Sequence, residues 1–251
     1  MSFTFDGISS EALDLYVEKF PDRPVPRRKT TTYSVPGRSG DLIVDEDAWE
    51  NVIQPYEVYV RGGTVDMQTR VSAIAAWLVG SSGYKVLTDT YDTTVYRYAR
   101  VANAFDFINS LNKYGRATLE FDCKPQRYPT TDEILSHGVD EDGYTFTYPG
   151  GTGLLPAYPL IEITGKSASA IPYIRTGDLE IRIGATTAIS KIVIDFSTQS
   201  IYDASNNTYP ALTTVTGSWE MLGDGDTVYA EEEAGTLQGI TVTIKTRRHR
   251  I

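Results

Sequence analysis

The sequence predicts a mainly β protein of the α+β class, with one helix and two domains. Strict alternation of apolar and polar residues, the pattern of half-buried strands, recurs along the whole chain. A single segment has the spacing of an amphipathic helix instead. The length of 251 residues is sufficient for two domains that each bury a core.

The predicted strands follow from apolar residues at every second position. In one clear case Ala117, Leu119, Phe121 and Cys123 fall on one face, and the polar residues between them fall on the other. The same alternation predicts strands at 95–101, 179–183, 192–196 and 240–244.

The predicted helix runs from about Asp66 to Leu78. Its apolar residues recur at i, i+4, i+7, i+8 and i+11, which places them on one side of a helix. These residues are Met67, Val71, Ile74, Ala75 and Leu78. Thr64 or Asp66 can cap the start and Gly80 fits the end. We expect this helix to pack across a sheet.

A stretch rich in proline, glycine and threonine interrupts the alternation between Lys124 and Pro159. Such a composition is typical of a boundary between domains. We therefore predict an N-terminal domain at 1–130 that contains the helix, a linker at 131–156, and a C-terminal domain of strands only at 157–251.

The composition is acidic, with 23 Lys and Arg residues against 33 Asp and Glu residues and a formal net charge of −10. Like charge opposes wrapping on nucleic acid, so we expect no sequence-specific nucleic-acid binding. No signal peptide is recognisable, and the longest apolar run, Ala73–Val79, is too short to cross a bilayer. We expect a soluble protein made in the cytoplasm, without membrane insertion and without a disulfide within the chain, because Cys123 is the single cysteine.

Fragments that resemble motifs for catalysis or metal binding are incomplete. The tail of a phosphate-binding loop at 165–167 lacks its first glycine, because that position is Leu160. The acidic turn at 224–235 lacks the central glycine and the final glutamate of a calcium loop. Ser39 lacks the flanking pattern of a hydrolase nucleophile.

The remaining candidates for catalysis are poorly placed. His137 falls in the predicted linker and His249 in a basic tail, so neither is positioned as a general base. Cys123 lies on the apolar face of its strand and is predicted to be a core residue. We therefore predict no enzyme, no catalytic residue, no cofactor and no metal site. A glycosidase function stays an open alternative, because it depends on the distance between two catalytic carboxylates, which a sequence does not give.

The stretch YSVPGRSGDL, at 33–42, predicts the tip of a β-hairpin. Val35 to Arg38 fits a type II turn, in which Pro36 fixes the first central residue and Gly37 takes the positive φ of the second. The arm before the turn is basic and the arm after it is acidic, which suits contacts between copies of the chain; an ordinary surface turn is the alternative. The candidate interface residues are Arg27, Arg28, Lys29, Pro36, Gly37, Arg38, Gly40, Asp41, Asp45 and Asp47.

Two basic clusters, at 23–29 and 245–251, stand out in this acidic chain. Neither has the interleaved aromatic residues of a nucleic-acid site. We expect them to meet acidic surfaces on neighbouring copies, with 41–50 and 229–233 as candidate counterparts.

Taken in order, these features resemble one family, the distal tail proteins (Dit) of long-tailed bacteriophages, the siphophages, and of related prophages. The opening FTFDGISSEALDLYVEK, the stretch VPGRSGDL and the following NVIQPYEVYV are similar to the start of that family. The helix, GYKVLTDTYDTTVYRYARV and the later strands YPLIEITG, IVIDFSTQSIYDAS and ITVTIKTRRHRI come in the family's order. SWEMLGDG, at 218–225, keeps the aromatic residue, the leucine and the glycine of a family turn but not its prolines.

The resemblance implies a structural virion component at the tail tip. It implies an N-terminal belt domain, related to tail-tube subunits, that closes a homo-hexameric ring, and a C-terminal galectin-like β-sandwich. Such a ring joins the major tail (tube) protein to the tail-tip hub or tail-associated protein, and carries baseplate or receptor-binding proteins for host adsorption while DNA passes through its channel. The alternative function is a binding module for host cell-wall carbohydrate or receptor.

Overall fold

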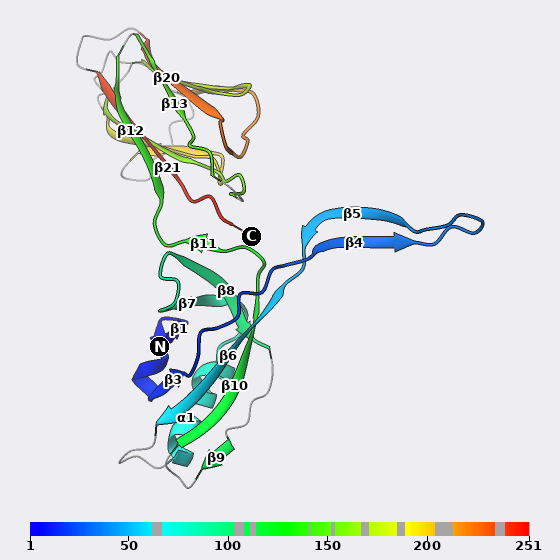
Figure 1. Cartoon of the computed structure of the whole chain (residues 1–251). Coiled ribbons are helices and arrows are strands. Elements are labelled where there is room, and N and C mark those ends of the chain that lie inside the picture. Colours follow the sequence, from blue (N-terminus) through cyan, green and yellow to red (C-terminus); the bar gives the residue numbers. More distant parts are fainter. Residues whose placement is uncertain are drawn as a thin grey trace. The chain divides into compact units, whose positions relative to one another are not determined.

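The computed structural model of the chain describes residues 1–61, 67–102, 108–110, 114–140, 142–151, 154–166, 171–184, 189–203, 213–233 and 239–250. It divides into two compact units, Met1–Thr130 and Thr131–Arg250 (Figure 1). Antiparallel strands make up most of both units, and the described residues contain one α-helix, α1 (Met67–Gly80). The predicted mainly β fold with one helix is confirmed.

The first unit is built on one large antiparallel sheet with the strand order β2-β1-β7-β8-β10-β6-β3, in which β11 also pairs with β8 and β9 with β10. A short 3-10 helix, η1 (Ser10–Leu13), connects β2 to β3. The strands are β1 (Phe3–Phe5), β2 (Ile8–Ser9), β3 (Leu15–Val17), β6 (Val52–Arg61), β7 (Lys85–Asp89), β8 (Val95–Val101), β9 (Ile108–Ser110), β10 (Tyr114–Cys123) and β11 (Tyr128–Pro129).

Helix α1 packs across this sheet, as its spacing predicts. Ile74, Trp77 and Leu78 are buried in one cluster with the inner faces of β1, β6 and β10. The Trp77 ring stacks on Phe3 at 5.7 Å, and its Nε1 donates to the carbonyl of Phe5 at 3.1 Å. The helix extends to Gly80 rather than Leu78, and the predicted cap residues 64 and 66 lie outside the described residues.

Cys123 occupies the inner face of β10 and is buried in the same cluster. Burial raises the pKa of its thiol to about 12, so the side chain is neutral at physiological pH. The alternation that predicts a core cysteine is therefore confirmed.

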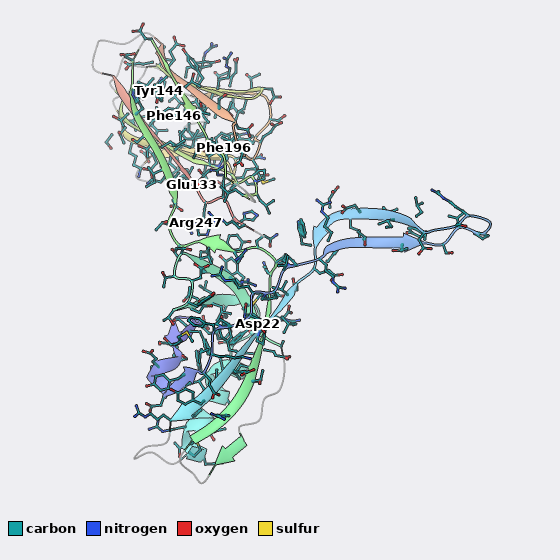
Figure 2. All side chains as sticks on the ribbon, viewed as in Figure 1. Asp22, Glu133, Tyr144, Phe146, Phe196 and Arg247 are labelled. Carbon is teal, nitrogen blue, oxygen red and sulfur yellow. The ribbon has the colours of Figure 1, made fainter. Side chains whose placement is uncertain are left out.

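The second unit consists of two five-stranded antiparallel sheets, in the orders β12-β21-β14-β17-β18 and β13-β20-β15-β16-β19. The strands are β12 (Glu133–Val139), β13 (Tyr144–Thr147), β14 (Leu160–Lys166), β15 (Ile171–Thr176), β16 (Leu179–Ile183), β17 (Ile189–Asp195), β18 (Ser200–Asp203), β19 (Thr213–Thr216), β20 (Thr227–Glu233) and β21 (Ile240–Thr246). Apolar residues from both sheets share one buried cluster, including Phe146 and Phe196, which Figure 2 labels. The unit is thus a β-sandwich.

The segment 131–156 differs from the expected linker. It supplies β12 to one sheet and β13 to the other, and Val139, Phe146 and Tyr148 are buried in the core. Proline and glycine are concentrated just after β13, at Pro149–Gly151, in the connection from β13 to β14. Their density marks a connection inside the sandwich, and the division between the units lies before β12.

The basic tail after β21 also differs from the expectation, because two of its arginines, Arg247 and Arg248, pair within the second unit. Arg247 Nε donates to Asp132 at 2.7 Å. Arg248 donates to Glu133 at 2.7 and 3.1 Å and to the carbonyl of Pro149 at 2.8 Å, and it forms an ion pair with Asp224. These charges are therefore neutralised inside one chain.

A second internal charge cluster lies on β14. The carboxylate of Glu162 forms ion pairs with Lys191 from β17 and Lys245 from β21, and each Nζ lies 2.8 Å from Oε1 of Glu162. Burial alone would raise the pKa of Glu162, but the hydrogen bonds and charges of the two lysines outweigh it and lower the pKa.

The incomplete motifs fall at structural positions. Gly165 and Lys166 close β14, and the remainder of that motif lies outside the described residues. Asp224 pairs with Arg248, and Asp226 accepts the backbone N–H of Gly223 at 2.7 Å, so both carboxylates of the acidic turn have partners in the chain. No helix in the described part of the chain is long and apolar enough to cross a membrane.

Candidate subunit-interface hairpin

The candidate interface residues lie on or directly beside a separate two-stranded sheet, formed by β4 (Arg28–Tyr33) and β5 (Leu42–Trp49) (Figure 1). Tyr33 pairs with Leu42 in the register of this sheet. The turn between the strands has the predicted type II geometry, because the N–H of Arg38 donates to the carbonyl of Val35 at 3.1 Å and Gly37 has a φ of 82°. The predicted hairpin and its turn are confirmed.

Three of the predicted charged residues come together at the base of the hairpin. Arg28 forms an ion pair with Asp45, and its Nη1 lies 3.9 Å from Asp47 Oδ1. Its guanidinium also lies over the ring of Trp49, 5.1 Å from the centroid. The hydrogen bond from Arg28 and the backbone N–H of Asp47 lower the pKa of the Asp45 carboxyl. This part of the basic and acidic blocks is therefore internally paired.

A β-bulge brings these groups together. The register shifts between Arg28 and Thr30, and Asp47 on the opposite strand has a φ of 49°. The N–H of Asp47 donates to Asp45 Oδ1 at 3.0 Å, which holds the carboxylate toward the arginine. The sequence pattern does not predict the bulge, because aspartate at positive φ leaves no periodic signal.

The other predicted charges are available to a partner. Arg27, Lys29, Arg38 and Asp41 form no ion pair with any residue that the structure describes, and all four are exposed. Gly40, like Gly37, has a positive φ, and with Pro36 these residues shape the exposed tip. The structure thus separates the predicted set into a paired base and an unpaired tip and flank.

The hairpin also exposes apolar side chains that the sequence reasoning missed. Leu42, Ile43 and Val44 are 46%, 66% and 45% exposed, and Tyr33 is exposed as well. Side chains opposite each other in an antiparallel pair share a face, so Tyr33 and Leu42 lie on one face and Ile43 on the other. The sequence does contain a sign of this exposure. Leu42, Ile43 and Val44 are consecutive, and neighbouring residues of a strand point to opposite faces, so all three cannot be buried in one core.

Neither strand of the hairpin pairs with any other described strand. Its outer edges therefore carry unpaired backbone donors and acceptors. An isolated two-stranded hairpin is only marginally stable in water. Exposed apolar faces, free strand edges and unpaired charges together form a surface suited to another polypeptide.

The described residues contain no group of three or more His, Cys, Asp or Glu side chains that could hold a metal ion. His137, one of the sequence candidates for a general base, is exposed and stacks on Tyr144 with ring centroids 3.7 Å apart. His249 is partly buried beyond β21, and burial lowers its pKa. His137 thus lies on β12 and His249 beyond β21 in the second unit, and Cys123 lies in the core of the first unit.

No protein-family model and no curated protein matches the sequence. Among solved structures, the chain is similar to the Dit protein (gp 19.1) of phage SPP1, described as a paradigm of the hub adsorption apparatus in phages that infect Gram-positive bacteria. The TM-score is 0.71 at 14% identity, over 98% of this chain and 98% of that chain. Two structures of the phage p2 baseplate, with Ca and with Sr, match at TM-scores of 0.42 and 0.40 and 8% and 9% identity, each over 92% of this chain and 90% of the other.

The similarity to SPP1 Dit includes both units, because it extends over nearly the whole length of each chain. The family resemblance that the order of the sequence motifs predicts is therefore confirmed at the level of the fold. The chain has the fold of the SPP1 Dit protein.

Proposed function

We propose that the chain is a structural protein of a phage tail tip, in which six copies form a ring around a central channel for DNA. The first unit forms the ring, and the ring connects the tail tube to the tail-tip and host-adsorption proteins. The observation that carries this proposal is the β4–β5 hairpin on a Dit-type fold, since its apolar faces and strand edges have no cover in the described part of the chain.

Ring formation sets a requirement that the hairpin meets. Each subunit of a ring contacts its two neighbours through different surfaces, so one surface must be complementary to another elsewhere on the same chain. The hairpin supplies apolar side chains, backbone edges and the unpaired charges of Arg27, Lys29, Arg38 and Asp41. Full burial of an aliphatic side chain contributes about 1.5–3 kcal/mol, so covering three half-exposed ones contributes about 3 kcal/mol for each contact.

The charge of the chain supports the same role. A net charge of −10 opposes retention of DNA by the wall of a channel. The pairing of Arg247 and Arg248 within the second unit withdraws two basic groups that could otherwise bind phosphate.

The test is the mass of the purified chain in solution, measured by light scattering over a range of concentrations. We expect six copies for the unmodified protein and smaller species for Ile43→Asp, because a carboxylate cannot be buried in the contact. Ile134→Asp is the matched control, since Ile134 is a 61% exposed strand residue of the second unit. A monomer at every concentration, or equal masses for Ile43→Asp and the control, would contradict the proposal.

A further inference from the structure

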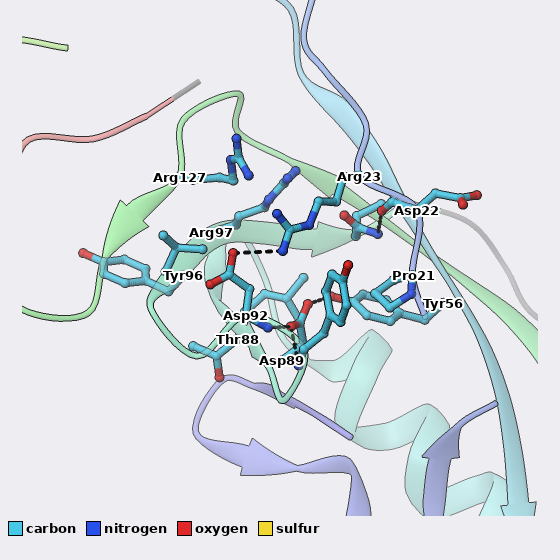
Figure 3. Close-up of a pocket in the computed structure, with 14 residues that line it drawn as sticks. Pro21, Asp22, Arg23, Tyr56, Thr88, Asp89, Asp92, Tyr96, Arg97 and Arg127 are labelled. Atoms are coloured by element: carbon cyan, nitrogen blue, oxygen red, sulfur yellow. Dashed lines mark hydrogen bonds and ion pairs between the residues drawn. The ribbon is translucent and has the colours of Figure 1, made fainter. Parts of the chain in front are cut away.

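A small polar cavity of about 40 Å³ lies within the first unit, apart from the hairpin (Figure 3). It forms where the end of β7, the start of β8, the segment Pro21–Arg23 and Arg127 meet. Three arginines from different segments line it: Arg23, Arg97 and Arg127. The volume exceeds the roughly 10–15 Å³ that one water needs and is sufficient for a small polar group.

Two carboxylates beside the cavity are already occupied by the turn between β7 and β8. Asp89 accepts the hydroxyl of Tyr56 at 2.9 Å and the backbone N–H groups of Tyr91 and Asp92 at 3.0 and 2.8 Å. Asp92 in turn accepts the hydroxyl of Thr94 at 2.6 Å. These acceptors shape the turn and leave little capacity for further donors.

Arg23 fills part of the remaining capacity of Asp92, with its Nη2 at 3.3 Å from the carboxylate. Its guanidinium also lies over the ring of Tyr91, 4.7 Å from the centroid. Arg127 contributes its charge to the same carboxylate and lowers the pKa of Asp92 after the larger effect of the Thr94 hydroxyl. Two guanidinium groups therefore share one aspartate.

Arg97 has one donor without a partner, although its charge and a hydrogen bond from its side chain act on Cys123 and lower the pKa of that thiol against the larger effect of burial. Its Nη1 is buried and forms no hydrogen bond with any residue that the structure describes. A buried donor on a charged group is costly to leave unpaired, so native structures provide a partner. Figure 3 shows its guanidinium beside that of Arg23, and the carboxylate of Asp22 points away from both. The cavity is thus lined by three arginines and three aspartates; Asp89 and Asp92 already accept hydrogen bonds, and Arg97 keeps one unpaired donor.

We propose that this cavity is a binding site for a carboxylate, which accepts the free Nη1–H of Arg97 and is held by the charges of Arg23 and Arg127. A carboxylate is planar and matches the fork of a guanidinium, and charge-assisted bonds of this kind are short and strong. Free small carboxylates and the acidic side chains of other proteins share this chemistry, and the test below separates the two sources. The site lies within the first unit, so it forms whether or not six copies close a ring.

The test compares the thermal unfolding of the full chain in sodium acetate and in sodium chloride at equal ionic strength. Acetate at about ten times its Kd raises the unfolding temperature by about 3–6 °C relative to chloride. Arg97→Gln abolishes this difference and Arg23→Gln reduces it, which keeps the test available if Arg97→Gln fails to fold. Arg100→Gln is the control, because Arg100 lies on the same strand but bonds to Asp122 at 2.8 Å outside the cavity.

Equal unfolding temperatures in acetate and chloride would overturn the site and leave a water-filled cavity. An acetate effect that persists in Arg97→Gln would overturn the assignment to this cavity. An acetylated pentaglutamate amide then distinguishes the source: tighter binding than acetate supports a protein side chain, and no binding of the peptide overturns that source.

Discussion

Replacing Arg248 by methionine is expected to destabilise the second unit by about 3 kcal/mol. The side chain is 1% exposed, and methionine retains much of its apolar volume while removing the charge and the donors. The substitution removes two hydrogen bonds to Glu133, one to the carbonyl of Pro149 and the ion pair with Asp224.

The magnitude follows from what stays behind. Removing one partner of a fully buried ion pair costs about 3–5 kcal/mol, because the other charge is left without solvent. Here the side chains of Glu133 and Asp224 are 35% and 41% exposed, so water can partly solvate them and reduce that cost. Loss of the contact between the Arg248 guanidinium and the Tyr148 ring, at 5.6 Å, adds about 0.5–1 kcal/mol.

The assay is equilibrium unfolding in urea, followed by the fluorescence of Trp219, which packs against Phe196 in this unit. Trp49 and Trp77 are replaced by phenylalanine in all samples so that Trp219 alone reports. Arg247→Met is the matched control, since its ion pair with Asp132 is exposed and such pairs contribute at most about 1 kcal/mol. If both substitutions cost the same, the reasoning from burial is refuted.

Three further predictions concern the hairpin, acid stability and the thiol. Arg38→Glu is expected to weaken assembly because it reverses the charge of an unpaired residue at the hairpin tip, whereas Arg38→Lys keeps the charge and should assemble normally. If light scattering gives the same mass for both variants, Arg38 is not part of the interface. The lowered pKa of Glu162 stabilises the fold above about pH 4.3, and this contribution is lost as the pH falls through the lowered value. Glu162→Gln should therefore flatten the dependence of the urea midpoint on pH between 3 and 6. If the midpoint of the variant changes with pH as steeply as that of the unmodified protein, Glu162 does not make this contribution. Cys123 should react with a thiol reagent at pH 8 only after unfolding, so rapid labelling of the native protein would contradict its burial.

Local patterns predict the elements well because they depend on near neighbours. The alternation around Phe121 identifies β10 and its inner face, and the spacing of Ile74 and Leu78 identifies α1. Pro36 and Gly37 predict the hairpin turn because each restricts or permits a particular φ.

Features that depend on distant segments could not be predicted in this way. Arg248 bonds to Glu133, which is more than a hundred residues away along the chain. The sequence alone therefore predicts an exposed basic tail at 245–251, and only the folded sandwich brings the two residues together. The two strands of 131–156 lie in a stretch rich in turn residues, β13 is only four residues long, and the membership of both in the sandwich depends on pairing with β20 and β21. The cavity at Arg97 likewise requires segments that only the folded sheet brings together.

The position of β21 has a consequence for synthesis of the protein. This strand lies between β12 and β14 in the interior of its sheet, although it is the last of the described strands along the chain. On the ribosome, the first unit can fold once residues 1–130 have emerged, whereas the sandwich cannot pair β12 until 240–246 have left the exit tunnel. Every nascent chain therefore passes through a stage in which the edges of β12 and β14 are open, and a truncation before residue 240 would make that stage permanent.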